Sequence, residues 1–142
     1  MKKRAPRPSQ DPVRIDYQAL AEFRFALRRF LAFSAEAVKK AGLTPQQHQA
    51  LLALKGGSDT ESMTVQELAA QLLVQHNSTV ELVDRLEVSG LVRRARDLED
   101  GRRARVLLTS KAQRLLRSLS SAHIQELKAA RPAFLALLRK LD

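Results

Sequence analysis

The feature that most constrains this chain is a basic segment at residues 93–109, which reads RRARDLEDGRRARVLLT. Six arginines flank a short acidic tip, and each flank is typical of a strand, over residues 92–96 before the tip and 104–108 after it. Asp100 and Gly101 form a strong turn signal within a loop longer than a tight hairpin. Because such a hairpin has little apolar surface to bury, its outer side needs a partner other than a protein core.

Length and composition limit the class of protein. A chain of 142 residues with 44% hydrophobic residues is most simply one domain with its own core. No apolar run approaches the roughly 18 residues of a membrane span, and the start, MKKRAPRPSQDP, runs into prolines rather than an apolar segment. The lack of cysteine excludes disulfides, thiolate metal sites and a thiol redox switch. We expect a soluble, cytoplasmic protein without a membrane segment.

The positive charge is concentrated in two segments. The formal net charge is +10. Residues 1–14 carry five Lys or Arg and one acidic residue, and residues 91–117 carry nine Lys or Arg and three acidic residues. In the rest of the chain the basic and acidic residues cancel. A cationic block suits a polyanion, because neutralising its phosphates releases counterions. The alternative is a basic surface that only keeps the protein soluble. Residues 1–14 are also rich in proline, so we expect a flexible tail there.

The first predicted helix runs from residue 15 to about residue 40. Its apolar residues recur at steps of three, four and seven, which indicates an amphipathic helix, and Gly42 ends it. Phe25 and Phe33 lie off that apolar stripe. A helix that is apolar on more than one side either lies deep in a core or meets a second chain.

Two shorter helices follow, and both begin with a capping box. In the first, Thr44 caps the helix and Gln47 reaches back, and the glycines at 56–57 end it. In the second, Thr64 and Glu67 play the same parts. The residues between the two helices, GGSDTES, are predicted to form a polar loop.

A fourth helix ends at Gly90 and directs Val80, Val83 and Leu86 toward the core. Two short helices, the second with a polar start, fit a helix-turn-helix, although many helix pairs look alike. The basic hairpin that follows strengthens this interpretation. The polar first turn of the fourth helix consists of Gln75, His76, Asn77, Ser78 and Thr79.

A long helix begins after the hairpin at Thr109 and runs to about Ala130, and Pro132 should kink it or start another helix. The chain is therefore predicted to be mainly α with a small β-hairpin, a winged helix-turn-helix flanked by terminal helices. We assign residues 15–142 to a single domain and residues 43–109 to the winged helix-turn-helix within it.

Three segments resemble the multiple-antibiotic-resistance regulator (MarR) family: LVDRLEVSGLVRR, the D-x-x-DGR hairpin ending in LT, and LTPQQHQALLAL upstream. The similarity covers roughly residues 15–140. It implies a homodimer whose terminal helices, at 15–42 and 110–142, interdigitate. It also implies a repressor whose partner is double-stranded DNA, a palindromic operator, with recognition helices in successive major grooves and hairpin arginines in the adjacent minor grooves.

The resemblance also implies DNA contacts for the fourth helix, since Asn77, Ser78 and Thr79 match the positions that meet bases and phosphates in the family. Two positions depart from the family pattern. Leu73 stands where many relatives have glycine between the two motif helices. Gln75 stands where many relatives have a Ser, Thr or Asp cap, which affects the roles of Gln75 and His76.

In the hairpin, Arg102 matches the arginine at the tip of the family's wing, and Asp100 matches the acid two residues before it. A guanidinium is attracted to the negative potential of a narrow minor groove, and a neighbouring carboxylate can hold it in place. Arg103 and Arg105 are expected to contact phosphates, which positions the protein without reading sequence.

The remaining polar residues give weaker signals. Arg85 is expected near the DNA backbone or in a structural ion pair. The histidines His48, His76 and His123 have no metal-ligand spacing. His76 either contacts DNA or is solvated, and His123 shares a stripe with leucines, which favours a hydrogen-bonded interface histidine.

In the MarR family, small aromatic or anionic effectors often bind between the dimerisation and DNA-binding parts. By that analogy, we expect one pocket for such an effector; the alternative is that the same residues form core and dimer interface. The residues expected to line it are Phe23, Phe30, Phe33, His48 and Leu51.

The same sequence features fit functions other than a regulator. A sequence-indifferent architectural nucleic-acid binder would use the same basic surface without reading bases. A partner-binding module would use the apolar first helix. An enzyme has little support, because no nucleophile–base pair, phosphate loop or metal cluster is recognisable, and no cofactor is expected.

Overall fold

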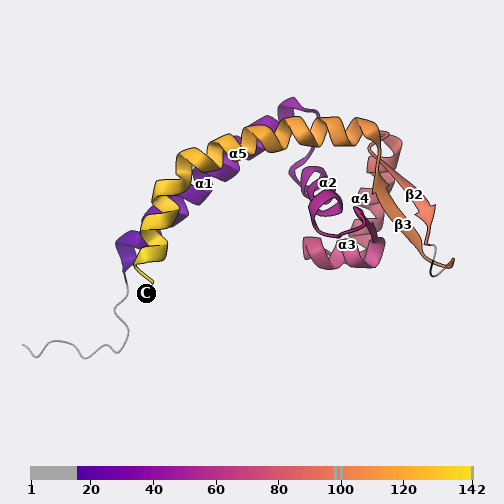
Figure 1. Ribbon diagram of the computed structural model, residues 1–142, viewed down its shortest axis with the longest axis horizontal. Helices are drawn as coiled ribbons and strands as arrows, with labels where there is room; N and C mark the ends of the chain where they lie inside the picture. Colours follow the sequence, from indigo (N-terminus) through magenta and orange to yellow (C-terminus); the bar gives the residue numbers. More distant parts are fainter. Residues whose placement is uncertain (1–15, 98, 100, 142) are drawn as a thin grey trace, which may run out of the picture.

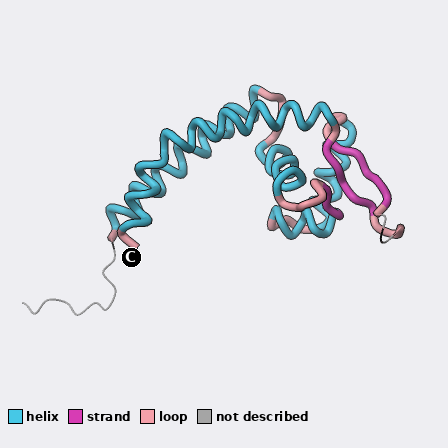
Figure 2. Tube along the Cα trace, in the orientation of Figure 1, coloured by secondary structure: helices cyan, strands magenta, loops and turns pink. Residues whose placement is uncertain are grey.

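The computed structural model describes residues 16–97, 99 and 101–141, so the expected basic tail and Asp100 lie outside the described residues. The chain has two parts (Figures 1 and 2): a long arm of two antiparallel helices and a lobe at one end of it. The arm consists of α1 (Tyr17–Lys40) and α5 (Ser110–Arg139). The lobe contains α2 (Pro45–Gly56), β1 (Ser62–Thr64), α3 (Val65–Leu72), α4 (His76–Val88), β2 (Val92–Arg96) and β3 (Ala104–Leu108).

The helix boundaries follow from their caps. The capping boxes predicted at Thr44 and Thr64 are confirmed. Each threonine hydroxyl accepts from the backbone N–H three residues on, and the backbone N–H of each threonine donates to the side chain of that same residue. Thr109 caps α5 by accepting from the backbone of Ala112. Its hydroxyl also donates to the carbonyl of Gly90 at 2.7 Å, which fixes the start of the arm helix on the end of α4.

The sheet has three strands rather than the predicted two. β2 and β3 occupy the predicted residues and pair antiparallel, but β3 also pairs with β1, giving the order β1-β3-β2. The expectation of a plain polar loop over residues 56–62 was therefore wrong for its last residue, Ser62. Met63, in β1, is buried opposite Val106. A three-residue strand has too short a pattern to be recognised without its partner.

The lobe core forms where α2, α3 and α4 meet one face of this sheet. Its fully buried side chains are almost all aliphatic, and burying each stabilises the fold by about 1.5–3 kcal/mol. Within α4, Val83 and Leu86 are buried as predicted, whereas Val80 is only half-buried. The largest of these buried side chains are Leu51, Leu54, Leu68, Leu86, Val83, Val92 and Val106.

α5 continues through Pro132 as one curved helix (Figure 1), so the alternative of a second helix starting there was wrong. Proline removes a single backbone donor, and a helix that packs along its length against another can retain its path despite that loss. Phe134, just beyond the proline, packs edge-to-face on Phe23 of α1, with ring centroids 5.5 Å apart.

The turn between α3 and α4 contains an unusual backbone conformation. Leu73 has φ 55° and ψ 41°, in the left-handed region, and its side chain is 93% exposed. Its N–H donates to the carbonyl of Ala70, and the next N–H, from Val74, donates to Ala69, so the conformation closes α3. The left-handed region costs a residue with a Cβ about 1–2 kcal/mol, which explains why glycine suits this position.

We predict that Leu73→Gly raises the free energy of unfolding by about 1 kcal/mol, because glycine removes the steric cost of the left-handed conformation. The control is Leu73→Ala, which removes the exposed apolar atoms but keeps the Cβ. Urea unfolding of the three proteins measures the effect. Equal stabilisation by alanine and glycine would show that the exposed side chain, not the backbone, is responsible.

Candidate nucleic-acid interface

The first turn of α4 presents backbone donors to solvent. Its N-cap, Gln75, makes no side-chain capping bond, in contrast to the caps of α2 and α3. Gln75, His76, Asn77 and Ser78 are all exposed. The uncapped N–H groups coincide with the positive end of the helix dipole, and together they favour an anion such as a phosphate.

Thr79 is the exception within this predicted set. It is fully buried, and its hydroxyl donates to the carbonyl of Gln75 at 2.9 Å. The expectation that Thr79 contacts DNA was therefore wrong for its side chain. A threonine can bond back to the carbonyl four residues earlier, and at this position the bond turns the side chain into the lobe.

Arg94 joins α4 to the hairpin. Its two terminal nitrogens donate to Asp84 at 2.7 Å and to Glu87 at 2.9 Å, so one guanidinium on β2 spans two acids on one face of α4. Exposed ion pairs contribute little free energy, but a forked pair fixes a geometry. The structural ion pair expected for Arg85 is thus made by Arg94 instead. Arg85 is exposed and forms no ion pair with a described residue.

Arg105 ties β1 to the wing, the hairpin formed by β2 and β3. Its Nε and Nη2 donate to the hydroxyl and the carbonyl of Ser62 on β1, both at 2.9 Å. Its guanidinium also lies 3.5 Å from carboxylate oxygens of Glu67 and Asp97. The Arg105 side chain is only 23% exposed, and its guanidinium is bound by groups of the protein itself. The expected role as a phosphate contact is therefore not supported.

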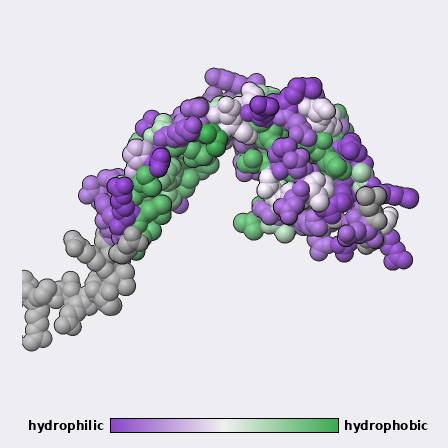
Figure 3. Space-filling view, in the orientation of Figure 1, coloured by the Kyte–Doolittle hydropathy of each residue, from purple (hydrophilic) through white to green (hydrophobic). Residues whose placement is uncertain are grey.

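The other four arginines of the wing, Arg93, Arg96, Arg102 and Arg103, are exposed. Figure 3 shows hydrophilic side chains over this end of the molecule. Arg94 and Arg105 thus build the wing, and the four exposed arginines give its surface a positive potential. The expected pairing of Arg102 with Asp100 falls on a residue outside the described ones.

The five residues predicted to line an effector pocket do not come together. Phe30 and Phe33 both contact the ring of His123, and His48 stacks on that same ring. Phe23, however, lies farther along the arm against Phe134, and Leu51 is fully buried in the lobe core. Their spacing along α1 indicated one helix stripe, but a stripe of several turns spans more than one site.

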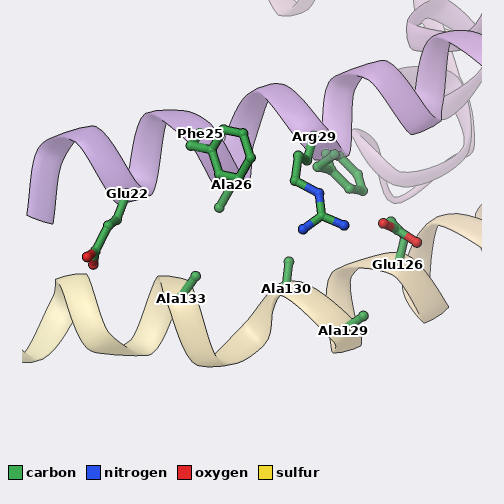
Figure 4. A pocket seen from close by; sticks show the side chains of 9 residues that line it. Glu22, Phe25, Ala26, Arg29, Glu126, Ala129, Ala130 and Ala133 are labelled. Atoms are coloured by element: carbon green, nitrogen blue, oxygen red, sulfur yellow. The ribbon is translucent and has the colours of Figure 1, made fainter.

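A different hollow, of about 320 Å³, lies between the arm helices (Figure 4). Of the predicted pocket residues, only Phe30 lines it. Phe25 and Arg29 of α1 border it, and small side chains of α5 form its floor. Its complete lining is Glu22, Phe25, Ala26, Arg29, Phe30, Glu126, Ala129, Ala130 and Ala133.

Within residues 16–141, excluding the two undescribed positions, no helix combines the length and apolar character that a membrane crossing requires. Over the same residues, no three His, Cys, Asp or Glu side chains gather where they could hold a metal ion.

A helix start with free donors, fixed beside a hairpin with exposed arginines, defines a winged helix-turn-helix of the nucleic-acid-binding class. Comparison with known proteins gives the family. The profile of the MarR family matches residues 41–103. The HTH-type transcriptional regulator TtmR of Methylorubrum extorquens (strain PA1) is 35% identical over 99 residues, 70% of this chain. The chain spans 46% of the length of that curated relative.

Solved structures share the fold over nearly the whole chain. AbsC, a MarR family transcriptional regulator from Streptomyces coelicolor, aligns with a TM-score of 0.68 and 21% identity over 92% of this chain and 90% of its own. A mutant of S. aureus MepR bound to an oligodeoxyribonucleotide aligns with a TM-score of 0.68 and 19% identity, over 91% of this chain and 100% of its own. NadR in complex with 4-hydroxyphenylacetate aligns with a TM-score of 0.68 and 23% identity, over 95% of this chain and 94% of its own. The chain belongs to the MarR family, whose members are transcriptional regulators rather than enzymes.

We predict that Arg105→Ala lowers the free energy of unfolding by about 2 kcal/mol, because it removes charge-assisted hydrogen bonds from a largely buried position. The slope of the logarithm of DNA affinity against the logarithm of salt concentration should stay unchanged, since no phosphate contact is lost. The matched control is Arg93→Ala, which removes the same charge from an exposed position on β2. Unchanged stability with a shallower salt slope for Arg105→Ala would restore the phosphate-contact interpretation.

Proposed function

We propose that this protein is a homodimeric, sequence-specific transcriptional regulator that represses by binding a palindromic DNA operator in the cytoplasm. The observation that carries the proposal is that the exposed start of α4 and the arginine-rich wing lie in one lobe, fixed to each other by Arg94. The start of α4 would enter the major groove with Gln75, Asn77 and Ser78 at its leading end. Arg102 would enter the neighbouring minor groove.

The arm supports the homodimer because it leaves apolar side chains uncovered. Phe25 is 58% exposed beside the hollow between α1 and α5, and Figure 3 shows apolar surface along the arm. A two-fold interface is self-complementary, so a large side chain of one copy would fill a space lined by alanines in the other. The large exposed apolar residues on or just beyond the arm helices are Tyr17, Leu20, Phe25, Leu31, Ile124, Leu127, Leu138 and Leu141.

A small aromatic or anionic effector would control such a regulator by shifting the positions of its two lobes. The solved NadR structure contains 4-hydroxyphenylacetate, an aromatic carboxylate, which supports an effector of that class for this fold. The effector would need higher affinity for the dimer geometry that misplaces the recognition helices, since equal affinity for both geometries shifts nothing.

Selection of bound duplexes from a random DNA library tests the proposal. The selected sequences should share a palindrome, and the protein should bind them at least a thousandfold more tightly than random duplex at the same salt, on the order expected for specific regulators. A ratio near one would instead identify a sequence-indifferent architectural binder, which uses the same basic surface.

We predict that Arg102→Ala weakens binding to the selected duplex about tenfold or more, because each copy loses its minor-groove contact. Arg117→Ala serves as the control: it removes the same charge from an exposed position on α5, away from the wing, and should change the dissociation constant less than about twofold. Fluorescence anisotropy measures both. An equal effect of the two substitutions would mean that only net charge matters.

We predict that Phe25→Glu converts a dimer to a monomer, because it places a charge in an apolar contact between copies. Val88→Glu makes the same change at an apolar residue of the lobe that is 89% exposed, and it should leave the dimer intact. Sedimentation velocity distinguishes the two states. A wild-type protein that sediments as a monomer at micromolar concentration would exclude the proposed dimer.

A further inference from the structure

Two buried histidines stack where the arm meets the lobe. The rings of His48 on α2 and His123 on α5 have centroids 5.0 Å apart at an interplanar angle of 29°. The two residues are only 3% and 8% exposed. Phe30 and Phe33 of α1 contact the His123 ring edge-to-face, at 5.8 and 5.7 Å. The pair therefore joins three helices, two from the arm and one from the lobe.

His123 keeps both of its hydrogen bonds in either protonation state. Its Nδ1 lies 2.6 Å from the carbonyl oxygen of Leu119, which can only accept, so this nitrogen carries a proton. Its Nε2 lies 2.7 Å from the hydroxyl of Ser34 on α1. A hydroxyl both donates and accepts, so a neutral ring accepts from Ser34 and a protonated ring donates to it.

The surroundings of His48 disfavour its protonated form. Its Nδ1 lies 3.3 Å from the side-chain nitrogen of Gln49, an arrangement in which the amide donates and the ring nitrogen accepts. If Nδ1 gained a proton, its N–H would face the N–H of the Gln49 amide, and two donors would meet without an acceptor. Burial lowers the pKa of His48 below its ordinary value of 6.5, and positive charge on His123 lowers that pKa further.

Within the part of the chain that the structure describes, no acidic group compensates a positive charge at this site. Among the described residues, no carboxylate lies within ion-pair distance of either ring, and the groups facing the pair are aromatic, hydroxyl, amide and carbonyl. The nearest charged residues along the three helices are exposed or half-exposed. They are Arg29 and Glu36 on α1, Lys55 on α2, which pairs with Glu61, and Glu126 on α5, which lines the arm hollow.

We propose that the stacked histidines form a proton-sensitive contact that holds the lobe to the arm and releases it when both rings are charged. This regulatory role rests on the proposed DNA-binding function. Two charged rings in contact repel each other in a buried site, and separating them requires α2 to move away from α5. A lobe that moves relative to the arm no longer holds the two recognition helices of a dimer at one spacing, so DNA affinity falls.

The pH window follows from the sign of the His48 shift. The unfolded chain takes up the proton near pH 6.5, and the folded chain does so only at lower pH. The stability that this histidine contributes is therefore complete above pH 6.5 and is lost as the pH falls through its lower folded pKa. Weak acidification should loosen the contact, whereas alkaline pH should leave it unchanged.

The first experiment uses the full chain without DNA. NMR titration of the histidine ring protons should place the pKa of His48 below 6.5 in the folded protein and return it to about that value in urea. Hydrogen exchange should show that protection of α2 amides, corrected for intrinsic rates, falls about tenfold between roughly pH 7.5 and pH 5.5. In His48→Phe, which keeps a stacked ring that cannot titrate, protection should stay constant.

The second experiment measures affinity for the selected duplex over the same pH range. His76 is exposed on α4 at the proposed DNA surface, so the comparison is made in a His76→Gln background. The dissociation constant should rise about tenfold toward pH 5.5 with His48 present and less than about twofold with His48→Phe. Equal pH dependence of the two proteins would overturn the proposal.

The two experiments separate the failure of the contact from the failure of the function. If the protein binds no duplex at any pH, the proposed function is wrong, and hydrogen exchange alone decides whether the histidine contact responds to protons. Protection that falls equally in the wild type and in His48→Phe would overturn the proposal. Circular dichroism and thermal unfolding at pH 7.5 or so check that His48→Phe is folded.

Discussion

The antiparallel packing of α1 against α5 is the contact on which the rest of the structure depends. It joins residues from opposite ends of the sequence and carries the lobe at one end (Figure 1). Two helices alone cannot cover their apolar residues on all sides, and Phe25 and its neighbours stay exposed. That uncovered surface is what a second copy would bury. The arm thus determines both where a second lobe would lie and how rigidly the spacing between two lobes is held.

The arginines of the wing divide into two groups. Arg94 and Arg105 bind acids and backbone within the lobe, so they fix the wing to α4 and to β1. The exposed arginines then project from a hairpin whose angle is set by the first group. The buried side chains of Val92, Val106 and Leu108 hold the wing on the lobe core, and the two charged side chains add contacts to neighbouring elements. The positive potential needed at a DNA surface and the rigidity needed to aim it come from the same residue type.

Local signals in the sequence predicted most of the fold. The capping boxes at Thr44 and Thr64 and the hairpin strands act through neighbouring residues, so their patterns are visible in the chain. β1 was missed because three residues pair with a strand more than forty positions away. The backbone donors of α4 were predictable, but the burial of Thr79 and the partners of Arg105 depend on tertiary contacts that no local pattern contains. The effector set failed for the same reason, since helix periodicity does not tell which turn meets which neighbour.

The central claim is that two lobes, held by one pair of arms, engage two major grooves on the same side of a duplex. Hydroxyl-radical footprinting of the protein on its selected duplex tests this claim most directly. We predict two protected tracts whose centres lie one helical turn, about 10 base pairs, or a whole number of turns apart. A single protected tract, or a separation that is not a whole number of turns, would contradict it.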